Sequence, residues 1–228
     1  RESMYQLGNN VIEGPVGLRN MVYFDNNFKS PIFEYVWEPA TATGPVMEYS
    51  DCFYKVCPGG NLHNGNNLHT CGFHAHWLLE QQVRYFVLSL NDSSLWRSAG
   101  SQPGWTMVLF EGREEITIHE KGFKARRGRV IGIVDDLYSA ILHHAPAFFD
   151  QDCLSRALLS AVRNFRPPKA KWVGRLPMLK KLNPFAHYPV TFLAERYFQV
   201  PLVPADTVDK LLAEYNAAYW KAPLDIPA

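Results

Sequence analysis

Cysteines are scarce in this sequence, and long apolar runs are missing. The four cysteines are Cys52, Cys57, Cys71 and Cys153. They are too few and too unevenly spaced for a disulfide framework in a chain of 228 residues, so we expect reduced thiols. No apolar run approaches the roughly 18–20 residues that a membrane span requires. The polar start Arg1-Glu2-Ser3 resembles neither a signal peptide nor a transit peptide, which favours a cytoplasmic protein without membrane contact.

An excess of one charge is absent as well, since 23 lysines and arginines face 22 aspartates and glutamates, for a formal net charge of +1. This balance gives no general electrostatic basis for binding nucleic acid. Charged residues make up 20% of the chain, hydrophobic residues 47% and aromatic residues 14%, the opposite of a disordered composition. The chain is long enough for a sizeable core and shows neither a repeat nor a clear boundary, so we expect one domain over residues 1–228.

Hydrophobic patterning places strands before helices along the chain. Strands are predicted at Pro31–Trp37, Asp51–Cys57, Thr106–Phe110, Glu115–Glu120 and Val130–Val134, the third and fourth as a hairpin. Helices are predicted at Ala75–Leu90, from a cap at Asp135 to Pro146, at Leu154–Phe165, and from a cap at Asp206 to Tyr219. The predicted fold class is α+β, with mostly antiparallel N-terminal and central strands, one central amphipathic helix, and C-terminal helices packed on the sheet.

A basic segment interrupts the even distribution of charge. Residues 153–194 contain no acidic residue, but they contain eight lysines and arginines and several prolines. The segment fits a lid over an anionic ligand, a subunit contact, or a solvated basic loop. The aromatic content exceeds what one small pocket needs, which favours a buried contact between two copies and hence a homodimer.

Histidines concentrate ahead of the predicted central helix. His63, His69, His74 and His76 lie within fourteen residues and are followed closely by Glu80 and Arg84. On a helix, His76, Glu80 and Arg84 would form one polar stripe. A carboxylate among aromatic side chains is desolvated and can exchange protons near neutrality, so Glu80 is a candidate proton shuttle. Lys55 and His69 would approach it from the preceding segment. His74, His76, Trp77 and Arg84 are candidate substrate-binding residues.

The order Lys55, His69, Glu80 resembles the catalytic trio of the bacterial β-carboline-forming Pictet–Spenglerases. In that family an Arg stands where this chain has Lys55, and the spacing between the His and the Glu differs slightly. The resemblance implies condensation and cyclisation of a tryptophan-like aromatic amine with an acidic aldehyde, without a cofactor. It also implies that Lys55 and His69 hold the aldehyde and its carboxylate while Glu80 transfers protons. The many tryptophans, tyrosines and phenylalanines would suit an indole.

A metal site is the main alternative. The pattern His74-x-His76-x3-Glu80 resembles the first metal motif of cupins, with His119 as the candidate ligand from a second motif. This resemblance implies a metal-dependent oxygenase with iron, manganese or zinc. A cupin places its two histidines on one face of a strand, whereas the helix predicted from Ala75 places His74 and His76 on different faces.

Two further alternatives stay open. His76-Trp-Leu-Leu-Glu80, followed by Arg84-Tyr-Phe, resembles elements of the stay-green magnesium dechelatases, which implies a tetrapyrrole substrate. The other alternative is a protein that binds an aromatic ligand without chemistry. In that case the polar stripe is a solvated helix face, and the histidines satisfy one another and nearby backbone groups.

Overall fold

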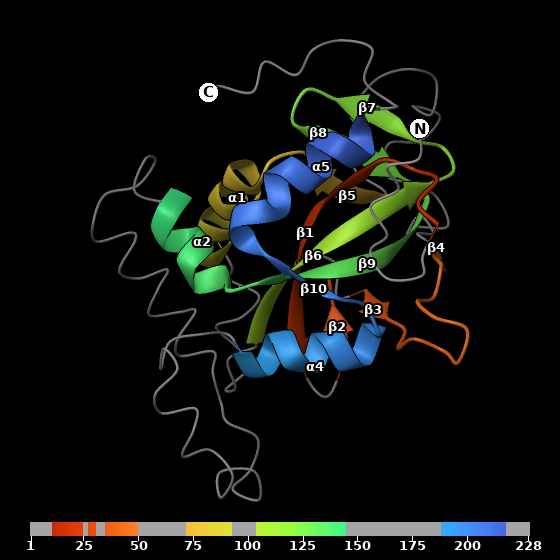
Figure 1. Ribbon diagram of the computed structural model, residues 1–228, viewed down its shortest axis with the longest axis horizontal. Helices are drawn as coiled ribbons and strands as arrows, with labels where there is room; N and C mark the ends of the chain where they lie inside the picture. Colours follow the sequence, from red (N-terminus) through yellow and green to blue (C-terminus); the bar gives the residue numbers. More distant parts are fainter. Residues whose placement is uncertain are drawn as a thin grey trace, which may run out of the picture.

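The computed structural model describes residues 11–24, 27–30, 35–49, 72–92, 104–144 and 188–217 (Figure 1). Within these ranges ten strands form one mostly antiparallel sheet, with β10-β9-β6-β1-β5-β8-β7 as its main path. The short strands β2 and β3 extend from β1, and β4 pairs with β9. The strands are β1 Val16–Phe24, β2 Asn27–Lys29, β3 Val36–Trp37, β4 Glu48–Tyr49, β5 Phe73–His76, β6 Gly104–Arg113, β7 Thr117–His119, β8 Gly122–Ala125, β9 Arg127–Asp135 and β10 Leu202–Pro204.

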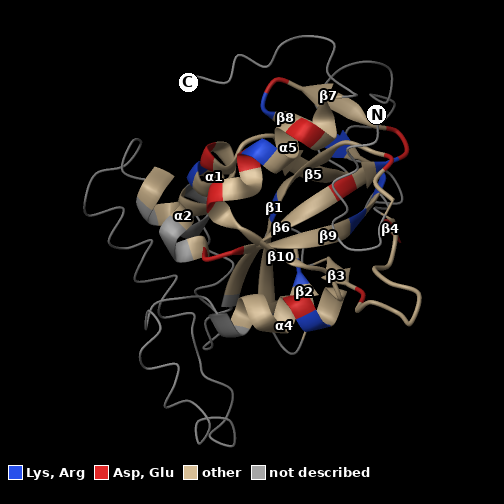
Figure 2. Cartoon of the chain, viewed as in Figure 1, with Lys and Arg blue, Asp and Glu red and all other residues tan. Residues whose placement is uncertain are grey.

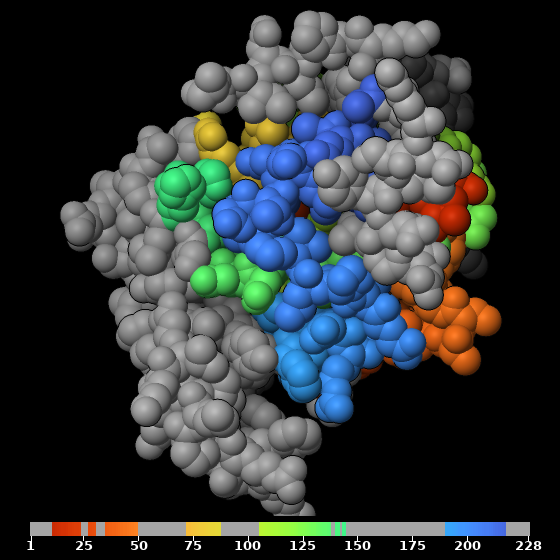
Figure 3. Space-filling model, in the orientation of Figure 1, coloured from red at the N-terminus to blue at the C-terminus, as the bar shows by residue number. Residues whose placement is uncertain are grey.

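Helices cover both faces of the sheet. They are α1 Leu79–Asp92, α2 Leu137–His144, α4 Tyr188–Phe198 and α5 Val208–Asn216, with a 3-10 turn η5 at Ala205–Thr207. In Figure 1, the edge strand β10 runs between α5 and α4, and both helices are visible in the space-filling view of Figure 3. Helices α1, α4 and α5 each carry charges of both signs (Figure 2). The α+β class, the antiparallel sheet and the packed C-terminal helices confirm the prediction.

The central strand β1 contributes side chains to two buried cores. Val16, Leu18 and Val22 face one core, which α1, α2 and α5 cover. Met21 points to the opposite face, into a second core that contains Trp37 and residues of α4. Both faces of β1 are thus buried, which explains why its sequence lacks the alternation of a half-exposed strand.

The sheet curls so that β8 approaches β6, although the two strands are not paired neighbours. Phe123 of β8 stacks on Phe110 of β6, with ring centroids 6.1 Å apart and an interplanar angle of 18°. A Cβ atom at Gly112 would lie 2.3 Å from Phe123, so this approach requires glycine. The curl carries β5, which lies between β1 and β8, against the second core.

Several predicted elements need correction. The central helix begins at Leu79 and not at Ala75, because Phe73–His76 forms β5. The predicted hairpin of residues 106–110 and 115–120 is wrong: β6 pairs with β1 and β9, and β7 pairs with β8. Asp206 lies in η5, and Thr207 occupies the N-cap position of α5 without a side-chain cap bond.

Other predictions fall outside the described residues. These are the strand at 51–57, the helix at 154–165, all four cysteines, and the part of the basic segment that precedes Tyr188. Among the helices that the structure describes, none combines the length and apolar character that a bilayer span would demand.

Candidate functional site

Strand β5 places His74 and His76 on the same face. Phe73 and Ala75 alternate with them and point into the second core. The expectation that His74 and His76 lie on different faces is therefore wrong, since a strand repeats every two residues. Trp77 follows directly; it is 2% exposed, and its indole N–H donates to the backbone oxygen of His119 over 2.9 Å. Trp77 is thus a core residue that ties β5 to β7.

Gln82 of α1 reaches the backbone of β1 beside this pair. Its amide satisfies its neighbours in one orientation, in which Nε2 donates to the oxygen of Leu18 over 2.8 Å and to Nδ1 of His76 over 2.6 Å. Oε1 then accepts from the backbone N–H of Asn20 over 3.1 Å and from the Asn20 side-chain amide over 2.9 Å. Gln82 is 1% exposed and Asn20 3% exposed, so this network is buried. The ring of Tyr85 contacts that of His76 from the same helix, at 5.3 Å.

Arg19 lies where β1 and β5 separate. The two strands pair only at Leu18 and His76, and we call the place beyond this pair the β1–β5 fork. There the guanidinium of Arg19 donates through Nη1 to the backbone oxygen of His74, and Nη2 lies 3.4 Å from Oγ of Ser30. Arg19 and Gln82 thereby satisfy backbone groups that a continuous strand pair would have used.

Three aromatic rings surround the Arg19 guanidinium. Its Cζ lies 5.6 Å from the ring centre of Trp37 and 5.3 Å from those of Phe73 and Phe110. Burial lowers the pKa of Arg19 to about 10. Nε is buried without a hydrogen-bond partner, and no described carboxylate forms an ion pair with this side chain. The fork therefore holds a positive charge that the described residues do not neutralise.

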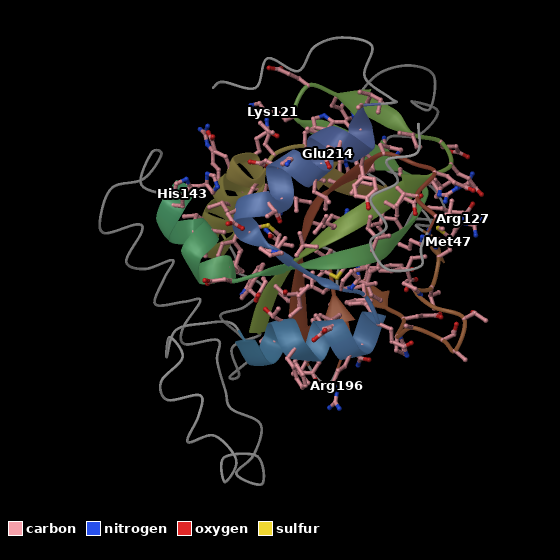
Figure 4. All side chains as sticks on the ribbon, in the orientation of Figure 1. Met47, Lys121, Arg127, His143, Arg196 and Glu214 are labelled. Atoms are coloured by element: carbon pink, nitrogen blue, oxygen red, sulfur yellow. The ribbon has the colours of Figure 1, made fainter. Side chains whose placement is uncertain are left out.

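Burial and nearby positive charges lower the pKa of both histidines. Burial of the ring, with the charges of Arg19 and Lys124, lowers the pKa of His74 to about 4, although part of the residue stays exposed. Lys124 is the cross-strand partner of His74 on β8. Burial also lowers the pKa of His76, and the charges of Arg19 and Lys121 act in the same direction. In Figure 4, Lys121 is labelled in the upper part of the view, above α1 and α5.

Glu80 and Arg84 occupy the exposed side of α1. Glu80 lies in the first turn, and its exposure differs from the desolvated setting that the sequence predicted. Because β5 ends at His76, the predicted helical stripe of His76, Glu80 and Arg84 does not exist. The charge of Glu80 acts instead on His144 of α2, raising its pKa against the larger lowering by burial.

The four candidate metal ligands lie on three elements. His74 and His76 are on β5, Glu80 is on α1, and His119 is exposed on β7. Across the described ranges, no three residues of the His, Cys, Asp or Glu type are grouped closely enough to hold a metal ion. The site as described thus offers the pair His74 and His76 to a metal, and no third ligand.

Part of the predicted site lies elsewhere in the chain. Lys55, His63 and His69 fall in residues 50–71, outside the described residues, so their distance from Glu80 stays a prediction. The sequence analysis missed Arg19 and Asn20. The signal for them was the polar pair in the middle of the apolar segment Val16–Phe24, and Gln82 was likewise the one polar interruption of the apolar stripe of the central helix.

The chain was also compared with known proteins. No family model, curated protein or solved structure matches it. Its functional interpretation therefore depends on the residues of the site.

Proposed function

We propose that this protein condenses and cyclises a tryptophan-like aromatic amine with an acidic aldehyde by acid–base catalysis, a Pictet–Spengler reaction that closes the β-carboline ring system at its tetrahydro level. The observation that carries the proposal is that His74 and His76 share one face of β5, where burial and the charges of Arg19, Lys121 and Lys124 lower the pKa of these histidines. No described carboxylate contributes to the pKa shift of either histidine. Such a site favours a ligand that brings its own negative charge and an oxygen that accepts hydrogen bonds.

The chemistry assigns a role to each group. The amine adds to the aldehyde carbon, and the carbonyl oxygen leaves as water, which gives an iminium ion. The aromatic ring then attacks the iminium carbon, and a positioned base must take the proton that the ring carbon loses. We assign that base to Glu80 in the first turn of α1, and the binding of the aldehyde and its carboxylate to Lys55 and His69. Ring closure by this route needs no cofactor, and we place the reaction in the cytoplasm, in a homodimer.

A condensation assay tests this function. The protein is incubated with tryptophan and a carboxylate-bearing aldehyde, and mass spectrometry follows a product of the summed mass less one water. Glu80→Gln should abolish product formation while leaving amine binding intact, because the amide cannot accept the proton. Glu115→Gln makes the same change on an exposed side chain of the β6–β7 turn and should leave the rate unchanged. Equal product from the Glu80→Gln variant would remove Glu80 from the mechanism, and no product from the wild type would reject this reaction.

A metal-dependent oxygenase of the cupin kind is the second candidate. It gains support from β5, because His74 and His76 share a strand face as two ligands of a cupin motif do. Elemental analysis of the purified protein separates the two functions, since stoichiometric iron, manganese or zinc would favour the oxygenase. A thermal-shift screen with aromatic amino acids, tetrapyrroles and divalent metals covers the remaining alternatives, because each predicts a different stabilising ligand.

A further inference from the structure

We propose that Gln82 holds His76 as the neutral tautomer with its proton on Nε2, so that His76 donates a hydrogen bond to an oxygen atom of the ligand. Gln82 is then a positioning residue, and His76 is a donor and not a base. The identity of that oxygen as the aldehyde carbonyl rests on the proposed function, whereas the tautomer itself does not.

The backbone of β1 determines which way the Gln82 amide points. The oxygen of Leu18 can only accept a hydrogen bond, and the backbone N–H of Asn20 can only donate one. The amide nitrogen of Gln82 must therefore face Leu18, at 2.8 Å, and its oxygen must face Asn20, at 3.1 Å. Reversing the amide would place two acceptors against each other at Leu18 and two donors at Asn20. Both contacts are buried, so each mismatch would be costly.

The amide nitrogen that faces Leu18 also faces His76. Its second hydrogen points to Nδ1 of His76 over 2.6 Å, so Nδ1 must accept. A neutral imidazole carries one proton, which then resides on Nε2. Protonating Nδ1 would set two N–H groups against each other, which opposes the imidazolium form in the same direction as burial and the nearby cations. Within the described ranges His76 forms its hydrogen bond through Nδ1, which leaves the proton on Nε2 for a ligand.

This arrangement limits what His76 can do. Nε2 could act as a base or bind a metal only after its proton moved to Nδ1, where the Gln82 amide opposes it. As a neutral donor, His76 suits a carbonyl oxygen that gains negative charge as the amine adds to the carbon. The charge of Arg19 favours that role, because it lowers the pKa of His76 and so opposes the imidazolium form.

Nuclear magnetic resonance of the protein with 15N-labelled histidine tests the inference without substrate. At pH 7.5 a long-range 1H–15N correlation spectrum, which reports the two-bond couplings of the imidazole ring, should show His76 of the wild type with a protonated Nε2 and an unprotonated Nδ1. Gln82→Glu should reverse the tautomer and raise the pKa of His76, because a carboxylate can only accept from Nδ1. Gln81→Glu makes the same change one residue earlier on α1 and should leave the tautomer of His76 as it is.

Each result supports or overturns the proposal. A proton on Nδ1, or an imidazolium, in the wild-type spectrum at pH 7.5 would overturn it even if the Gln82 variant did not fold. Retention of the Nε2–H tautomer in a folded Gln82→Glu protein would remove Gln82 from the positioning role. Because no turnover is needed, a failed condensation assay beside the expected spectrum would reject the proposed reaction and keep the tautomer.

Discussion

The guanidinium of Arg19 donates a hydrogen bond to the backbone oxygen of His74, across the fork where their two strands separate. One side chain thereby satisfies a backbone group of β5 and places a positive charge near both histidines of the candidate site. Arg19→Met removes both the charge and the hydrogen bond, but it retains an apolar side chain of similar length that still contacts the aromatic rings.

Replacing Arg19 should change the titration of His74. Arg19→Met removes the largest electrostatic cause of the low pKa of His74, so that pKa should rise from about 4. It should stay below 6.5, because burial, the largest cause of all, remains. Lys124→Met removes a smaller cause and should give a smaller rise. The measurement is the pH titration of the His74 ring resonance, and a larger rise in the Lys124 variant would contradict this ranking.

The histidines should make the protein less stable in acid. The pKa of His74 is about 4 in the folded protein and near 6.5 in the unfolded chain. Between these values the unfolded chain binds more protons, so the free energy of unfolding falls as the pH falls from about 6.5 towards 4. His74→Asn should weaken this dependence, and urea unfolding at several pH values measures it. If the free energy of unfolding changes with pH in the same way in the wild type and the variant, then His74 has the same pKa in the folded and unfolded states, which would contradict this prediction.

Asp209 should stabilise the start of α1. Its Oδ1 accepts from the backbone N–H of Leu79 over 2.7 Å, so a residue of α5 supplies a helix cap to α1. Asp209→Ala should lower the free energy of unfolding by about 1 kcal/mol. Asp206→Ala is the matched control; Asp206 is exposed in η5, where no side-chain cap bond forms, and the cost should be within about 0.5 kcal/mol. Equal losses in urea unfolding would contradict the assignment of the cap.

Glu111 should be the most sensitive acidic residue. Its side chain is fully buried and lies 2.9 Å from Nε of Arg113 and 2.8 Å from Nε of Arg129. It also accepts from the backbone N–H groups of Glu13 and Gly14. Glu111→Gln should cost about 3 kcal/mol, as expected when one partner of a buried ion pair is removed.

The exposed ion pair of Glu115 with Arg126 gives the comparison for Glu111. Glu115→Gln should cost about 0–1 kcal/mol, because water screens an exposed pair. Both variants are measured by urea unfolding at neutral pH. If Glu111→Gln lowers the free energy of unfolding no more than Glu115→Gln does, the buried network does not hold Glu13 and Gly14 to β6.

The sequence allowed parts of this fold to be predicted where burial follows a simple period. The apolar stripe of α1 at Leu79, Val83, Phe86 and Val87 is buried as predicted. The stripe was extended too far because Ala75, which points into the core from β5, coincides with the helical repeat. Strand β1 was not predicted, because both of its faces are buried and its sequence therefore lacks the alternation of apolar and polar residues.

The site itself depends on contacts between distant parts of the chain. Arg19 and His74 are 55 residues apart, and Leu79 and Asp209 are 130 residues apart. No local spacing indicates such pairs, because strand pairing and helix packing bring them together. The sequence pointed to the histidines and Glu80 as candidates, but it could not reveal that Gln82 and Arg19 set the state of the two imidazoles.

The most direct test of this account is a titration of 15N-histidine protein with a carboxylate-bearing aldehyde, following the Nε2–H resonance of His76. We predict a saturable shift of that proton as the ligand oxygen accepts its hydrogen bond. The ring of His144 on α2 serves as an internal reference and should change little. Saturable binding of the aldehyde that leaves His76 unaltered, or no binding at all, would contradict the assignment of this strand face as the functional site.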